Sequence, residues 1–247
     1  MSRHALAHRH RVLAALAEEA GAESELTRAN ANEYELMLVK LDADRRRLKA
    51  VQSTERKVAV KRELLPAYRA WCEGVIASGS PRQDEVFMTV LIWTIDTGDF
   101  ATALPMAQHA IAHDLALPDR FQRTTACLIA EEMAETAFKH EGAELAADAP
   151  QLLACAELVA EADMPDEVRA KLLKACGYAL RARAERAEPS EHSAAEYFEL
   201  RRQALECLTR ALQLHDKCGV KKDIERLERE LRQASPSPPD TAGPPPA

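Results

Sequence analysis

Helix-forming residues fill this chain to about residue 233, and the runs of β-branched and aromatic residues that mark strands are missing. Alanine, leucine, glutamate and arginine are abundant, whereas the chain has only 8 glycines and 4% aromatic residues. At 247 residues the chain is long enough for one large helical domain or two small ones. We therefore predict an all-α fold.

The N-terminal third is expected to form a long helix or a helical hairpin. A first helix covers about residues 5–20, and a second, capped by Asn30 or Asn32, runs to Leu65, where Pro66 breaks or kinks it. Seven of the ten heptad a and d positions along the second helix hold apolar residues, which is enough for a coiled-coil-like stripe. This stripe predicts an oligomer interface formed by Met37, Leu41, Leu48, Val51 and Val58.

Turn and cap residues divide the rest of the chain into further helices. The next helix is expected to end at Gly79, and Ser80 with Pro81 then reads as the cap and first residue of another. That helix contains VFMTVLIWTI, which is apolar nearly all round and therefore predicted to be buried. A turn at Thr97–Asp99 and a helix with Leu104 and Leu115 follow, and then helices near 120–141, 149–161, 165–187, 192–215 and 220–233.

The later helices resemble the helical hairpins of tetratricopeptide-type proteins, although a 34-residue repeat is not evident. The final segment, SPSPPDTAGPPPA, is proline-rich and almost uncharged, so it is expected to be disordered. The predicted organisation is a basic helical region for DNA binding or oligomerisation at 1–66, a helical body at 67–233 and a disordered tail at 234–247.

Charge is distributed unevenly along the chain, whose formal net charge is −7. Residues 1–62 carry 13 Lys and Arg against 9 Asp and Glu, a net of +4. Residues 63–163 carry 5 against 17, a net of −12, and residues 164–247 carry 15 against 14, a net of +1. This segregation suggests a basic arm working beside an acidic body.

The basic side chains of the N-terminal third are the candidate DNA contacts. A helix with a basic outer face can lie along phosphates and release their counterions. The alternative is a solvated charged face on a long helix. The predicted DNA-binding residues are Lys40, Arg45, Arg46, Arg47, Lys49, Arg56, Lys57, Lys61 and Arg62, joined by Arg3, Arg9 and Arg11.

Catalytic motifs are scarce. His109 and His113 have the spacing of a zinc-binding pair but lack an intervening glutamate and an obvious third ligand, and the sequence predicts no metal site or cofactor. Neither a phosphate-binding glycine loop nor a serine nucleophile elbow is present. The six cysteines are scattered singly and predicted to be free thiols in or near the core.

Four stretches of sequence resemble the small terminase subunit of cohesive-end tailed phages, in a group often labelled the terminase endonuclease subunit. They are YELMLVKLDADRRRLKAVQSTERKVAVKRELLP, DEVFMTVLIWTIDTGDFATAL, ADMPDEVRAKLLKACGYAL and GVKKDIERLERELR. They occur in the family's order from about residue 34 to 232. The resemblance implies ring-forming subunits that recognise the cohesive-end site on concatemeric phage DNA and present it to the large ATPase subunit. It supplies no catalytic residues, and the uncharged tail departs from the basic tail expected of relatives.

Three functions follow from these observations. The leading one is a DNA-recognition and assembly subunit, binding double-stranded phage DNA and the large subunit in the host cytoplasm. The second takes the family label literally: the chain cuts the cohesive-end site with Mg²⁺, using carboxylates among Asp84, Glu85, Asp96 and Asp99. The third is a helical scaffold that binds only protein. No stretch approaches the length of apolar sequence needed to span a bilayer, so a cytosolic location without membrane contact is expected.

Overall fold

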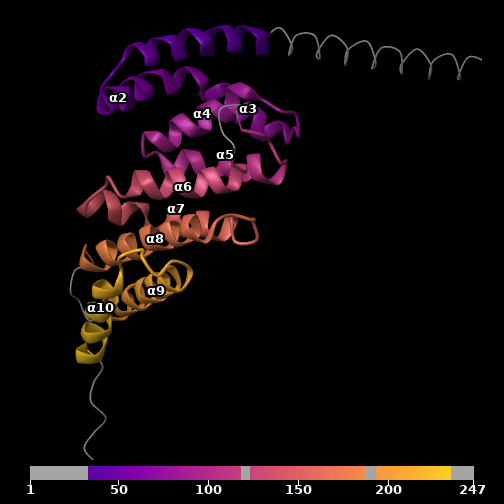
Figure 1. The fold of residues 1–247 in the computed structure, drawn as a ribbon. Coiled ribbons are helices and arrows are strands. Elements are labelled where there is room, and N and C mark those ends of the chain that lie inside the picture. Colours follow the sequence, from indigo (N-terminus) through magenta and orange to yellow (C-terminus); the bar gives the residue numbers. More distant parts are fainter. Residues whose placement is uncertain (1–32, 118–122, 187–192, 235–247) are drawn as a thin grey trace, which may run out of the picture. The chain divides into compact units, whose positions relative to one another are not determined.

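The computed structural model describes residues 33–117, 123–186 and 193–234, and these are helices joined by turns, with no strand among them (Figure 1). The all-α prediction is confirmed. The chain divides into two compact units, residues 1–57 and 58–247. The helix predicted near residues 5–20 and the predicted disordered tail lie outside the described residues. No helix in the described part of the chain is long and apolar enough to cross a membrane.

The long second helix of the prediction is in fact two helices. One covers residues 33–50, residues 51–53 are not helical, and α2 then covers Thr54–Leu64. Ser53 starts α2 by acting as its cap: its side-chain oxygen accepts the Arg56 backbone N–H at 3.2 Å. The prediction of one continuous helix to Leu65 is therefore wrong, because a local cap begins a new helix within the basic run.

After α2 the chain forms a short 3₁₀ turn, η1 (Leu65–Tyr68), which contains Pro66 as its second residue. Helix α3 (Arg69–Ser78) follows and ends at Gly79, whose φ of 59° is the left-handed conformation that favours glycine at a helix end. Both the proline break and the glycine stop agree with the sequence prediction.

Helix α4 (Glu85–Asp96) is the buried helix of the prediction, since every residue from Val86 to Ile95 is buried. Its beginning differs from the prediction. The cap is Asp84, whose carboxylate accepts the Phe87 backbone N–H at 2.8 Å and the Trp71 indole N–H at 2.9 Å. Ser80 was the wrong choice because its hydroxyl oxygen accepts the Arg82 N–H at 3.3 Å within the preceding turn.

The predicted turn at Thr97–Asp99 is present, and Asp99 caps α5 (Phe100–Ala112). Thr124 caps α6 (Thr125–Ala137), and α7 (Gly142–Leu158) follows. The predicted start of α7 near residue 149 is wrong, because Pro150 lies inside the helix rather than at its beginning. The remaining helices, α8 (Asp166–Arg186), α9 (Ser193–Leu214) and α10 (Lys221–Ala234), lie within a residue or two of their predicted ranges.

Helices α4 to α10 stack in chain order (Figure 1). Each contacts its neighbour in the sequence, and α4, α5 and α6 also contact the helix two places further on. This local pattern is typical of proteins built from stacked helical hairpins.

The core of the stack is rich in small residues, and α8 and α9 approach closely at Gly177. A Cβ atom at that position would lie 2.7 Å from the Cγ of Leu208 and 3.2 Å from the carbonyl oxygen of Ala204. The six cysteines are free, as predicted; Cys207 and Cys218 are half-buried and the others, Cys72, Cys127, Cys155 and Cys176, are buried.

Candidate nucleic-acid interface

The helix over residues 33–50 carries five of the predicted DNA-binding residues. Lys40 forms an ion pair with Asp44 at 2.5 Å, and Arg46 pairs with Asp42 one turn earlier. Arg46, Arg47 and Lys49 are exposed, whereas Lys40 and Arg45 are half-buried. The last two turns of this helix therefore present basic side chains to solvent.

Three residues of the predicted oligomer stripe, Met37, Leu41 and Leu48, lie on this helix, on a different face from its exposed apolar residues. Leu41 and Leu48 are buried in the single chain, and Met37 and Val51 are half-buried, as is Val58 on α2. The large apolar side chains exposed on the helix are instead Leu36 (70% exposed) and Val39 (69%). The stripe stays a prediction as a subunit interface.

Helix α2 begins with two further predicted contacts, of which Arg56 is exposed and Lys57 half-buried. At its other end Lys61 forms an ion pair with Asp96. Arg62 donates to the carbonyl oxygen of Thr97 at 2.9 Å. A helix C-terminus favours nearby cations, so these two residues hold the end of α4. Their charges are thus partly engaged inside the fold, which local sequence could not indicate. Arg3, Arg9 and Arg11 lie outside the described residues.

The four carboxylates considered for metal-dependent cleavage do not come together. Asp84 and Asp99 cap the helices α4 and α5, and Asp96 pairs with Lys61. Burial, with the Asp96 charge as a second cause, raises the pKa of Glu132 on α6. Among the residues that the structure places, no three His, Cys, Asp or Glu side chains are positioned to hold a metal ion.

His109 of α5 and His113, which follows the last residue of α5, lie with their ring centroids 4.5 Å apart and their ring planes 58° apart. His109 is buried, and its Nε2 lies 3.2 Å from the carbonyl oxygen of Ser80. Burial lowers the pKa of His109, and the adjacent His113 adds to the effect. Both rings have packing roles here.

Sequence reasoning did not identify a groove of about 710 Å³ beside α3, α4 and α5. Its lining is mainly apolar, and Arg62, Arg69, Glu73 and Asp99 contribute its charged groups. The groove depends on residues more than 30 positions apart, so no local motif marks it.

Comparison with known proteins gives a consistent result. The family model described as phage small terminase subunit matches residues 38–167. A relative from Escherichia phage P2, named terminase, endonuclease subunit, is 43% identical over 226 residues, covering 92% of this chain and 85% of the relative. A probable terminase, endonuclease subunit from Haemophilus phage HP1 (strain HP1c1) is 25% identical over 234 residues, covering 92% and 82%. No solved structure matches.

Proposed function

This chain belongs to the phage small terminase subunit family, and we propose that it is the DNA-recognition subunit of a phage packaging machine. In this role it binds the cohesive-end site of concatemeric viral DNA in the host cytoplasm, assembles as a homo-oligomeric ring and presents the DNA to the large ATPase subunit.

The observation that carries the DNA-binding proposal is the exposed basic group formed by Arg46, Arg47, Lys49 and Arg56. Each exposed cation can neutralise a phosphate and release a counterion, so affinity should fall steeply with salt. When many copies of the subunit contact the same duplex, their contacts add together. Weak phosphate contacts from each copy are then sufficient for tight binding by the oligomer.

The proposed contact with the large subunit is the acidic surface at the C-terminal end of α7 and in the loop that follows it. Glu157, Glu161 and Asp163 are exposed there, within the part of the sequence that has the most negative net charge. Reversing the charge of Glu157, Glu161 and Asp163 to lysine should weaken binding to the purified large subunit at low salt, and unchanged binding would refute this assignment.

A second candidate function is suggested by the relatives' names, which describe an endonuclease subunit. In that case the chain itself cuts the cohesive-end site with Mg²⁺, and the carboxylates responsible would have to converge in an arrangement that the described residues do not show.

One experiment separates these functions: a mobility shift with purified protein and cohesive-end DNA, across a salt series, with and without Mg²⁺. Binding without cleavage that weakens steeply with salt is the expected result. Site-specific nicking by this chain alone would support the endonuclease function instead, and absence of DNA affinity would support a protein-only scaffold.

A matched pair of variants tests the basic group. The first replaces Arg46, Arg47 and Lys49 with glutamine. The control, here called the scattered variant, makes Arg69→Gln, Arg82→Gln and Arg210→Gln, which removes the same charge from exposed positions on other elements. The first variant should lower DNA affinity and flatten its salt dependence. Equal behaviour of the two variants would refute the assignment.

A further inference from the structure

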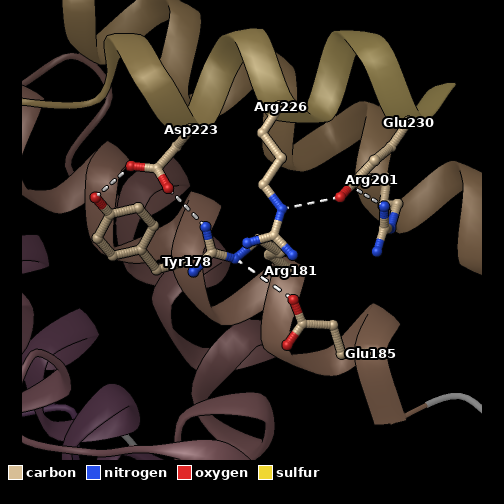
Figure 2. A network of polar contacts seen from close by, with 7 residues as sticks. All are labelled: Tyr178, Arg181, Glu185, Arg201, Asp223, Arg226 and Glu230. Carbon is tan, nitrogen blue, oxygen red and sulfur yellow. Dashed lines mark hydrogen bonds and ion pairs between the residues drawn. The ribbon is translucent and has the colours of Figure 1, made fainter. Parts of the chain in front are cut away.

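The last helix, α10, uses its inward-facing acids to bind its neighbours (Figure 2). The Asp223 carboxylate accepts the Tyr178 hydroxyl at 3.0 Å and an Arg181 N–H at 2.8 Å, both from α8. Glu230, two turns later, pairs with Arg201 of α9 and with Arg226 of its own helix. Two of the four carboxylates on α10 are therefore neutralised against the stack.

This arrangement leaves an excess of positive charge on the outside of α10 and the turn before it. Between residues 215 and 233 the exposed charged residues are six basic and three acidic. Four of the six, Lys217, Lys221, Lys222 and Arg229, form no ion pair in the described part of the chain. We call these four residues the C-terminal basic surface.

The C-terminal basic surface is held on a fixed support. The Lys174 Nζ on α8 donates to the carbonyl oxygen of Cys218 at 2.7 Å, which anchors the turn between α9 and α10. The same Nζ lies 5.7 Å from the ring centroid of Phe138 and 5.6 Å from that of Tyr178. Lys217, Lys221 and Lys222 therefore extend from a turn that α8 fixes, so little ordering is needed when they meet a ligand.

The spacing of the surface suits an extended polyanion. Lys222 and Arg229 are seven residues apart on one helix face, which is about 10 Å along the axis, and the lysines at the start of α10 reinforce the positive end of the helix dipole. Lysine is a flexible point charge that contacts phosphate without fixed geometry. The exposed residues of this surface include no apolar anchor of the kind that stable protein interfaces use.

We propose that the C-terminal basic surface is a second contact with the phosphates of duplex DNA, in addition to the N-terminal basic group. This inference rests on the proposed DNA-binding function and deepens it. It gives the helical stack its own phosphate contacts, and these contacts are independent of the uncharged tail.

The test is duplex binding by the variant Lys217→Gln, Lys221→Gln, Lys222→Gln across a salt series, compared with the scattered variant. Loss of three phosphate contacts should reduce the slope of log K against log salt by about 2–3 per subunit. Neither variant should melt at a lower temperature than wild type, because all of these side chains are exposed.

The outcomes distinguish this inference from the function on which it rests. A wild-type protein that binds no duplex DNA overturns both. A wild-type protein that binds, with a lysine variant whose affinity and slope match those of the scattered variant, overturns the C-terminal surface alone. A selective fall in slope for the lysine variant supports it.

Discussion

Replacing Gly177 with alanine tests the close approach of α8 and α9 through two opposing effects. Alanine is favoured over glycine inside a helix by about 0.5–1 kcal/mol, because glycine loses more backbone freedom on folding. At Gly177, however, the new methyl group would enter space that Leu208 occupies, and it would lie 3.2 Å from the backbone oxygen of Ala204.

The steric effect should be the larger. Leu208 is fully buried, so its side chain has no open space to rotate into, and the Ala204 oxygen belongs to the helix backbone. Overpacking of this kind typically costs about 1–3 kcal/mol. Subtracting the gain in helix propensity leaves a net destabilisation of about 0–2.5 kcal/mol, with a central value of about 1 kcal/mol.

Gly74→Ala is the matched control, since Gly74 also lies inside a helix, α3, but a Cβ there would meet nothing within 4 Å. It should stabilise the protein by about 0.5–1 kcal/mol. Urea unfolding followed by circular dichroism measures both, and Gly177→Ala should lower the midpoint by about 0.5 M at an unchanged slope. If both variants raised the midpoint alike, the helices would not approach closely at Gly177 and the packing argument would fail.

Three further outcomes are expected. The hydrogen bond from His140 to Asp148, at 2.6 Å, raises the pKa of His140. The stabilisation from the charged ring is therefore complete below pH 6.5 and lost as pH rises through the raised pKa, so unfolding free energy should fall over that interval in wild type but not in His140→Gln. Asp223→Asn should destabilise the protein by about 1–2 kcal/mol in urea unfolding. It removes the partly exposed ion pair with Arg181 and weakens the hydrogen bond from Tyr178. A change under about 0.3 kcal/mol would contradict the anchoring role of this carboxylate. The four buried thiols should resist a thiol reagent at pH 8 in the native protein, and the half-buried Cys218 should react before them. Burial raises the pKa of the thiols at residues 72 and 155 to about 12, so they hold little reactive thiolate at this pH. Rapid reaction of all six thiols would contradict the packing.

The sequence predicted elements well where the signal was local and strong. The run from Val86 to Ile95 is apolar on every face, and such a helix can only be buried. Gly79 and the Thr97–Asp99 turn likewise end the helices before them, because the residues at these positions are themselves unfavourable for continuing a helix. These predictions needed no knowledge of the neighbouring helices.

Boundaries were missed where the tertiary structure chose among several good local candidates. Ser80 and Asp84 are both acceptable caps, but Asp84 also receives the indole N–H of Trp71 from α3. The break at residues 51–53 similarly depends on one hydroxyl, that of Ser53, within a segment whose other residues favour a helix. Capping preference ranks residue types and does not rank two suitable residues that lie close together.

The candidate interface shows the same limit for charge. Lys61 and Arg62 look like any other cations in the basic run, yet their partners Asp96 and Thr97 lie 35 residues away. The acidic residues of α10 alternate with its basic residues. Only the structure shows that Asp223 and Glu230 point toward the neighbouring helices, and therefore which charges remain exposed. Composition can locate a basic segment, whereas the side of the helix that carries free charge depends on packing.

The contacts within the helical stack join each helix only to the next one or two helices along the chain, and this has a consequence for its motions. The helix at the end of the array has neighbours on one side only, so its opening breaks fewer contacts than the opening of an inner helix. The free energy of opening should therefore increase from the end of the array toward its middle. In native-state hydrogen exchange, the amides of α10 should therefore exchange through a smaller, separate opening than those of α6. A subunit of this kind can open at its last helix while the inner helices of the stack stay protected, without global unfolding.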